Sequence, residues 1–110
     1  MSLHRRAWTM RLKDGAEAAY DKAHAAVWPE LLDQMTASGI RQFHLFRTGT
    51  TIFAFQERDR PFPAPGAPAS ETTTRWWQEM SHLMVTDADG RPAHYPLKPV
   101  FSLTMTESAE

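Results

Sequence analysis

The centre of the chain carries the pattern that most restricts its fold, two β-rich runs separated by a very short connection. Residues 40–47 read "IRQFHLFR", residues 51–57 read "TIFAFQE", and the intervening "TGT" supplies Gly49 for a tight turn. Two such runs joined by a few residues that include glycine are typical of a β-hairpin. The remaining elements must therefore be arranged around a central antiparallel pair.

A strand and the start of a helix precede this hairpin. Residues 6–12, "RAWTMRL", alternate apolar and polar side chains, which puts Trp8, Met10 and Leu12 on one face of a half-buried strand. After the turn-forming "KDG", residues 16–27 are rich in alanine and predict a helix.

Pro29 divides the helical region in two. Proline in a helix interior removes a backbone hydrogen bond, whereas it suits the first position of a helix. We therefore expect a break at Trp28-Pro29 and a second helical piece that begins at Pro29 and ends at Gly39.

Two loops, a helix and a strand follow the hairpin. Residues 59–70, "DRPFPAPGAPAS", contain too much proline for a helix or a central strand, so they predict a long loop. Residues 71–84 predict another helix, with apolar residues at core spacing. We expect a last strand over residues 100–105, "VFSLTM", and a frayed tail over residues 106–110.

The predicted order of elements is β, α, β, β, α, β, which indicates an α+β fold of the ferredoxin-like type, with both helices on one face of an antiparallel sheet. The strand over residues 51–57 has Phe53 and Phe55 on one side and Ile52 and Ala54 on the other, so both sheet faces carry apolar side chains. We therefore expect a homodimer in which two sheets pack face to face, a dimeric α/β-barrel-type assembly.

Composition narrows the classes of partner. A chain of 110 residues predicts a single domain, residues 1–110, with a core over about 5–105. Twelve basic and thirteen acidic residues without a like-charged run favour neither nucleic acid nor an anionic membrane as partner. Cysteine is absent, and no segment reads as a membrane span or signal peptide, so we expect a cytoplasmic protein.

His24 is the first candidate for chemistry. It lies four residues after Tyr20 and four before Trp28, in "YDKAHAAVW", so a helix brings the phenol beside the imidazole. A single helix histidine is more often structural than catalytic. A neutral imidazole can give or take a proton near neutral pH, however, and a neighbouring phenol can orient a hydroxyl, so the two form a candidate acid/base pair.

Trp76 and Trp77, in "TRWWQEM", are the second candidate. Consecutive helix residues point about 100° apart, so Trp77 lies at the edge of the core if Trp76 packs inside it. Two indoles can simply pack, but a flat apolar ring with an N–H donor also suits a sugar. The pair is therefore compatible with a monosaccharide ligand.

Motifs for metals and cofactors are missing from the sequence. The five histidines lack His-x-His and His-Glu-x-x-His spacing, and "DADG" at 87–90 lacks the other ligands of a calcium loop. There is also no glycine-rich phosphate loop and no Gly-x-Ser-x-Gly motif. We expect no metal and no cofactor.

The order "RRAWTMRL", "Y-x-x-x-H-x-x-x-WPEL", "TIFAFQE", "RWWQEM" and "VFSL" resembles the L-rhamnose mutarotase family over about residues 5–103. The resemblance implies a homodimeric isomerase that interconverts the α and β anomers of a 6-deoxy-L-sugar without metal or cofactor. It implies that His24 is the proton donor, and that the substrate is contacted by the following residues: Tyr20, Phe43, Trp76 and Trp77.

Three departures from the family bear on the substrate. Phe43 stands where the family usually has a tyrosine that touches the sugar, and His44 could replace it only if a local bulge turned it to the same face. The family's "HNP" is "HAA" here, and the Pro-rich loop stands where relatives have a helical segment. The resemblance favours L-rhamnose, with L-fucose next.

Two other classes of function remain open from the sequence alone. One is a dimeric α/β-barrel monooxygenase or haem-handling protein, because such dimers share the fold. The other is a non-catalytic sugar-binding module, which would bind a monosaccharide without accelerating anomer exchange.

Overall fold

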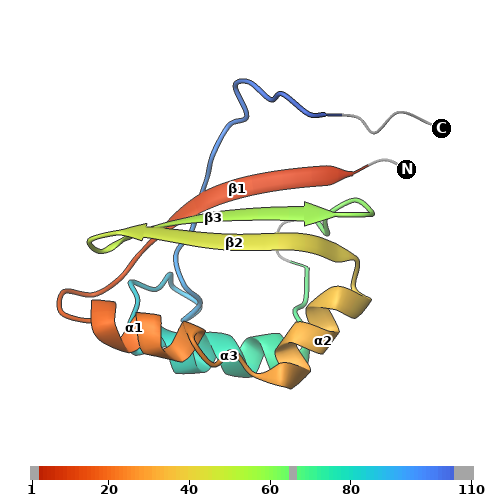
Figure 1. Ribbon diagram of the computed structural model, residues 1–110. Helices are drawn as coiled ribbons and strands as arrows, with labels where there is room; N and C mark the ends of the chain where they lie inside the picture. Colours follow the sequence, from red (N-terminus) through yellow and green to blue (C-terminus); the bar gives the residue numbers. More distant parts are fainter. Residues whose placement is uncertain (1–2, 65–66, 106–110) are drawn as a thin grey trace.

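The computed structural model describes residues 3–64 and 67–105 (Figure 1). Its elements are β1 (His4–Arg11), α1 (Glu17–His24), α2 (Pro29–Ala37), β2 (Ile40–Thr48), β3 (Thr51–Arg58), α3 (Glu71–Ser81) and β4 (Tyr95–Pro96). The strands form an antiparallel sheet in the order β2-β3-β1-β4. This order of elements confirms the predicted ferredoxin-like α+β fold.

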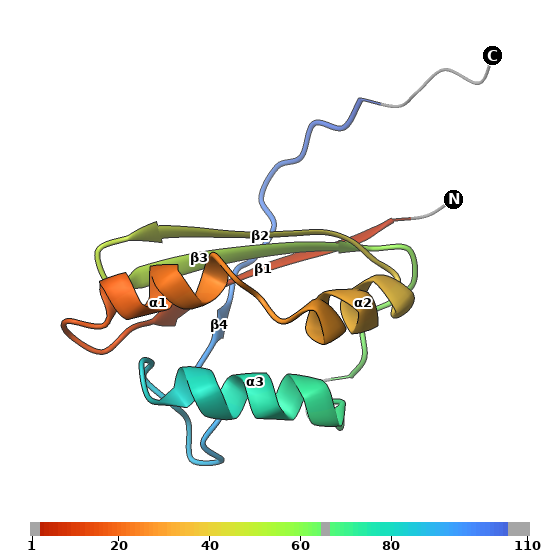
Figure 2. The same cartoon turned by 60° about the horizontal axis from the view of Figure 1, so that its bottom comes forward.

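The three helices of the described residues cover the same face of the sheet, and this part of the chain places no helix on the other face (Figures 1 and 2). The strand register places Ile52, Ala54 and Gln56 of β3 on the helix-covered face, where Ile52 has no exposed surface. Burying an aliphatic side chain of this size contributes about 1.5 to 3 kcal/mol. The core between sheet and helices is formed by the following buried residues: Leu12, Ala16, Tyr20, Ile52, Met80 and Met84.

The predicted hairpin is confirmed, with Gly49 and Thr50 connecting β2 to β3. Gly49 has a φ of +57°, a left-handed conformation that glycine adopts without strain. Gly39, directly before β2, has a φ of +99°, and a Cβ atom there would collide with the side chains of Asp59 and Arg60. The positive φ therefore favours glycine where the chain passes from α2 into β2.

The predicted break between the first two helices is confirmed, but it is wider than expected. Trp28 adopts an extended backbone, with φ −56° and ψ 128°, because a residue that precedes proline avoids the helical region. The first helix ends at His24 rather than at Val27. Trp28 is therefore not on the helix that carries Tyr20 and His24.

The last helix, α3, ends earlier than predicted. Ser70 caps its start, since the Ser70 hydroxyl accepts a hydrogen bond from the Thr73 backbone N–H at 3.1 Å. The predicted end at Met84 is wrong. The helix ends at Ser81, and Met84 forms a β-bridge with Leu12 instead. No helix in the described residues is long and apolar enough to cross a membrane.

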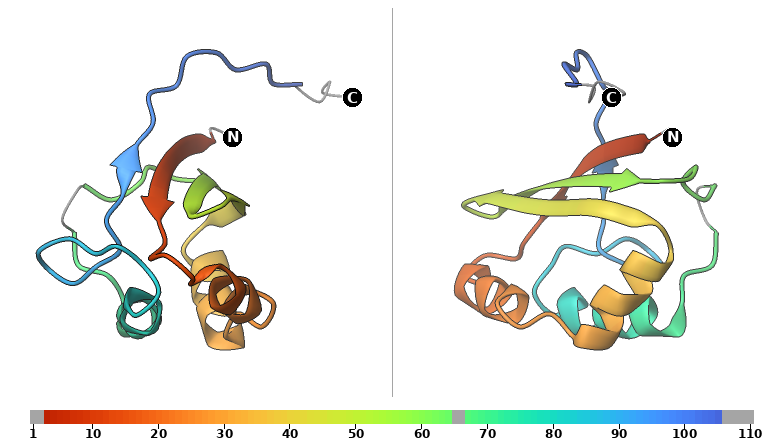
Figure 3. Two further views of the ribbon diagram at one scale, coloured as in Figure 1. Left: turned by 90° about the vertical axis from the view of Figure 1, so that its left-hand side faces the viewer. Right: turned by 45° about the vertical axis from the view of Figure 1, so that its right-hand side comes forward.

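The prediction of a last strand over residues 100–105 is wrong. The fourth strand is Tyr95–Pro96, which pairs with β1, and the Leu97 backbone N–H continues this edge by donating to the Ala7 carbonyl at 2.9 Å. Beyond it the chain runs away from the sheet on the side opposite the helices (Figure 3). Its apolar side chains are 82% to 92% exposed: Val100, Phe101, Leu103 and Met105.

The face of the sheet without helices carries exposed aromatic side chains. Phe53 and Phe46 pair across β3 and β2 on this outer face, and Phe53 is 41% exposed. In the part of the chain that the structure describes, the buried apolar core lies under the helices, and the buried residue of β3 on the outer face is the charged Glu57. The Pro-rich segment forms neither helix nor strand over residues 59–64 and 67–70, and the tail over 106–110 lies outside the described residues.

Candidate active site

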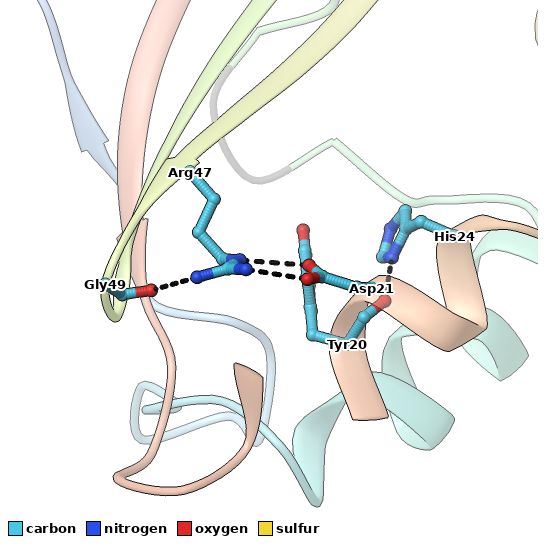
Figure 4. A network of polar contacts seen from close by, with 5 residues as sticks. All are labelled: Tyr20, Asp21, His24, Arg47 and Gly49. Carbon is cyan, nitrogen blue, oxygen red and sulfur yellow. Dashed lines mark hydrogen bonds and ion pairs between the residues drawn. The ribbon is translucent and has the colours of Figure 1, made fainter. Parts of the chain in front are cut away.

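Tyr20 and His24 lie side by side on α1, as their spacing predicted. Their ring centroids are 4.2 Å apart, and His24 Nδ1 lies 2.9 Å from the Tyr20 carbonyl oxygen (Figure 4). A carbonyl oxygen can only accept, so Nδ1 carries the proton of the neutral imidazole. Nε2 is then left with a lone pair that can take a proton from another group.

The Tyr20 phenol is deeply buried, with 5% of the residue exposed. Burial raises the pKa of Tyr20 to about 12, and the neighbouring Asp21 carboxylate adds to the increase. The phenol therefore keeps its proton near neutral pH. It can act there as a hydrogen-bond donor, while proton exchange is left to the imidazole.

Asp21 and Arg47 fasten α1 to the end of β2 (Figure 4). The Arg47 guanidinium donates through Nε and Nη2 to the two Asp21 carboxylate oxygens, at 2.9 Å and 2.6 Å, and through Nη1 to the Gly49 carbonyl. These hydrogen bonds hold the pKa of Asp21 below its usual value. The pair fixes the helix of His24 relative to the sheet.

Of the two adjacent indoles, Trp76 joins the imidazole and Trp77 does not. Trp76 meets His24 edge to face at a centroid distance of 5.3 Å, and it meets Trp28 in the same way at 5.0 Å. Trp77 instead lies under the Arg91 guanidinium, whose Cζ is 5.2 Å from its ring. The structure therefore brings Tyr20, His24 and Trp76 together, with Trp77 on a separate contact.

Two hollows flank the contact between His24 and Trp76. The first has a volume of about 280 Å³ and lies between α1 and the β2–β3 hairpin, where it is lined by Tyr20, Asp21, His24, Ala25, Leu45, Phe46, Arg47 and Ile52. The second, of about 350 Å³, lies between α1 and α3, and its wall includes Trp28 and Trp76. Small-molecule sites typically have volumes of about 300 to 1,000 Å³, so both hollows lie at the lower end of that range.

Phe43 lies on the helix-covered face of the sheet, with its ring centroid 6.0 Å from that of Trp8. His44 points to the opposite face, where its Nε2 lies 3.0 Å from Gln42 Oε1. The register shift in β2 falls between Ile40 and Gln42, so no bulge turns His44 around. His44 therefore does not share a face with Phe43, so it does not take the place of the tyrosine that the family usually has at residue 43.

A second polar feature of this face escaped the sequence analysis. Arg6 Nε donates to Oε1 of the buried Gln56 at 3.0 Å, and the Arg6 guanidinium lies over the rings of Phe62 and Trp8, with Cζ at 4.1 Å and 5.3 Å. The strand alternation already places Arg6 on the same face as Trp8. What the sequence lacks is any sign that a loop residue such as Phe62 packs on it.

Comparison with known proteins gives one consistent result. The sequence model of the L-rhamnose mutarotase family matches residues 5–103. An L-rhamnose mutarotase of Burkholderia orbicola (strain MC0-3) is 39% identical over 99 residues, which cover 88% of this chain and 95% of the relative. One from Bacteroides thetaiotaomicron is 33% identical over 103 residues, which cover 92% of this chain and 99% of the relative.

The fold comparison agrees with the sequences. The crystal structure of an L-rhamnose mutarotase from Formosa agariphila superimposes with a TM-score of 0.78 and 29% identity, covering 92% of this chain and 99% of that one. These relatives favour neither the monooxygenase or haem-handling alternative nor the non-catalytic one. The match of the family model over most of the sequence, together with relatives of similar length, shows that this chain belongs to the L-rhamnose mutarotase family.

Proposed function

We propose that this protein interconverts the α and β anomers of L-rhamnose, with His24 as its acid/base group. The observation that carries the proposal is the state of that imidazole: Nδ1 is committed to the Tyr20 carbonyl, and Nε2 is left to exchange protons at a pocket wall. Membership of the L-rhamnose mutarotase family supplies the substrate class.

The reaction requires proton movement and no other reagent. Nε2 of His24 takes the proton of the anomeric hydroxyl, the bond between C1 and the ring oxygen breaks, and C1 becomes an aldehyde carbon. The imidazolium returns the proton to the former ring oxygen. After rotation about the C1–C2 bond the steps reverse on the other face of the aldehyde, so atoms and charge balance without metal or cofactor.

The neighbouring side chains have distinct roles in this proposal. The neutral Tyr20 phenol donates a hydrogen bond to a sugar hydroxyl, and the indole of Trp76, which contacts His24, offers an apolar face and an N–H donor to the ring. Phe43 lies on the same face of β2 as Leu45, which lines the first hollow, and it has an apolar ring where the family usually has a tyrosine. Because that hydroxyl partner is missing, L-fucose is the second sugar to test.

Replacement of His24 by alanine tests the assignment. We expect His24→Ala to keep the fold and to lower catalysed anomer exchange of L-rhamnose by about 10²- to 10⁴-fold, the usual contribution of a positioned acid/base. Saturation-transfer NMR on the anomeric protons measures this rate above the uncatalysed background.

His82→Ala is the matched control, since His82 is an exposed histidine at the end of α3. It should leave exchange unchanged. If His24→Ala exchanged the anomers as fast as the unmodified protein, the role of His24 would be wrong. If the unmodified protein bound L-rhamnose without accelerating exchange, it would be a sugar-binding module.

We further propose that the functional unit is a homodimer built on the outer face of the sheet. Phe46 and Phe53 expose apolar surface there, and the extended segment over 97–105 carries exposed apolar side chains on the same side of the molecule (Figure 3). A second copy covers both features in a closed twofold arrangement, a dimeric α/β-barrel-type assembly.

Two further expectations belong with this proposal. The whole chain, residues 1–110, acts as one mutarotase domain. It works in the cytoplasm, which the absence of cysteine supports, and localisation of the tagged protein by cell fractionation tests this.

A further inference from the structure

The Asp21 carboxylate is held in one orientation at the wall of the first hollow. Arg47 donates to its two oxygens through Nε and Nη2, at 2.9 Å and 2.6 Å, and is itself tied to the Gly49 carbonyl through Nη1 (Figure 4). Asp21 and Arg47 both line this hollow, and so does His24. A carboxylate fixed in this way loses little further freedom when it binds a ligand.

Much of the hydrogen-bonding capacity of this carboxylate is unused. An ionised carboxylate has about four lone-pair sites, and Arg47 occupies two of those of Asp21. Within residues 3–64 and 67–105, the hydrogen bonds to the Asp21 carboxylate come from Arg47 alone. The Asp21 side chain is 54% exposed, so its remaining lone pairs are accessible to a ligand.

The carboxylate is in its charged form near neutral pH. The hydrogen bonds from the Arg47 guanidinium hold the pKa of Asp21 below its usual value. An ionised carboxylate only accepts hydrogen bonds, and bonds to a charged acceptor are stronger than those to a neutral one. Asp21 therefore offers the hollow strong acceptors that match hydroxyl donors.

The spacing of Asp21 and His24 suits one sugar ring. The two residues are three positions apart on α1, which places their Cβ atoms about 5 to 6 Å from each other. One monosaccharide ring with its hydroxyls spans such a distance. A sugar whose anomeric hydroxyl meets His24 Nε2 can therefore bring another of its hydroxyls to the Asp21 carboxylate.

The other walls of the first hollow complement this polar edge. Apolar side chains of Ala25, Leu45 and Ile52 also line it. Sites for small ligands typically combine apolar walls with a few fixed polar groups that set the orientation of the ligand. A 6-deoxy sugar has both characters, since it carries hydroxyls on the ring and a methyl group beside it.

We propose that Asp21 is a substrate-binding and specificity-determining residue, whose carboxylate accepts a hydrogen bond from a ring hydroxyl of the sugar while His24 acts at the anomeric carbon. Arg47 is a positioning residue that orients this carboxylate. The inference rests on the proposed function and adds to it a group that selects among sugars. A sugar without the accepted hydroxyl leaves the carboxylate without that partner, so it binds more weakly.

The test measures KM and kcat for anomer exchange with L-rhamnose and with its 2-, 3- and 4-deoxy analogues. We expect Asp21→Asn to raise the KM for L-rhamnose about tenfold, with kcat changed less, because the hydrogen bond is made in both ground and transition states. At least one analogue should have a raised KM with the unmodified protein and no further increase with Asp21→Asn. That loss of additivity identifies the accepted hydroxyl.

Two further variants separate sugar binding from the tie between α1 and β2. Arg47→Met breaks the ion pair but leaves the carboxylate in the hollow, so it should raise KM less than Asp21→Asn does. Asp33→Asn is the matched control, since Asp33 is an exposed carboxylate of α2 that lines neither hollow. It should leave KM and kcat unchanged for every sugar.

The outcomes separate this inference from the proposed function. A folded Asp21→Asn variant with an unchanged KM would overturn the role of Asp21 while leaving the mutarotase activity intact. Equal effects of Asp21→Asn and Arg47→Met, with additive losses for every analogue, would overturn it too, because the pair would then be only a structural tie. An unmodified protein that does not accelerate exchange would overturn the proposed function and this inference with it.

Discussion

Tyr20 links the candidate site to the stability of the fold, because its phenol is buried in the neutral form. Its pKa is raised from 10.0 to about 12 in the folded protein. Between these pH values the unfolded chain loses the phenol proton and the folded chain keeps it, so the free energy of unfolding falls as the pH rises. Two pKa units correspond to about 2 to 3 kcal/mol.

Tyr20→Phe should remove this alkaline loss. The variant keeps the ring but has no proton to lose, so its free energy of unfolding should decline less between pH 10 and pH 12 than that of the unmodified protein. Urea unfolding at several pH values measures the slope. Tyr95→Phe is the control, since Tyr95 is 55% exposed and should leave the slope unchanged. Equal slopes for all three proteins would contradict the cause given for Tyr20.

Some contacts of the candidate site could be predicted from the sequence, and others could not. The i, i+4 spacing predicted that Tyr20 and His24 would touch, because a helix fixes that contact locally. The Asp21–Arg47 pair joins residues 26 positions apart, and the position of Trp77 depends on Arg91. Such contacts follow from the packing of whole elements, so residue types alone could not predict them.

At the scale of elements, a small hydrogen-bond network holds the start of α3, the helix that carries Trp76. The Ser70 hydroxyl accepts from the Thr73 N–H and donates to Gln34 Oε1 of α2 at 2.8 Å. Thr73 Oγ1 donates to the same Gln34 oxygen at 2.9 Å. One serine therefore caps α3 and ties it to α2.

Ser70→Ala should lower the free energy of unfolding by about 1 to 2 kcal/mol, the usual cost of losing a helix N-cap. Chemical denaturation monitored by tryptophan fluorescence measures the change. Thr74→Ala is the control within the same helix, since the Thr74 hydroxyl bonds to no residue that the structure describes. A Ser70→Ala variant as stable as Thr74→Ala would show that the cap contributes nothing.

The elements also show where sequence periodicity reaches its limit. Alternation predicted β1, and the two β-rich runs with Gly49 between them predicted β2 and β3. Residues 100–105 alternate in the same way, yet they form no strand within this chain, and the short strand Tyr95–Pro96 carries no such pattern. An alternating pattern indicates that a segment has an apolar face. It does not indicate which surface covers that face, or whether this surface belongs to the same chain.

At the scale of the whole molecule, the exposed apolar surface lies mainly on one side. Helices cover one face of the sheet, while the outer face and the segment over 97–105 lie on the other side (Figure 3). A carboxylate introduced into a buried interface between two copies loses its hydration without gaining a partner. A carboxylate on an unpaired surface costs almost nothing, so charge substitution distinguishes the two situations.

Phe53→Glu should therefore convert the proposed homodimer into a monomer, by weakening association at least tenfold. Leu32→Glu is the matched control, because Leu32 is 47% exposed against 41% for Phe53 but lies on α2, away from the outer face. Analytical ultracentrifugation over a range of concentrations gives the mass of each variant. A dimer that persists in Phe53→Glu and is lost in Leu32→Glu would place the interface on the helices, and an unmodified protein that is monomeric throughout would exclude the dimer.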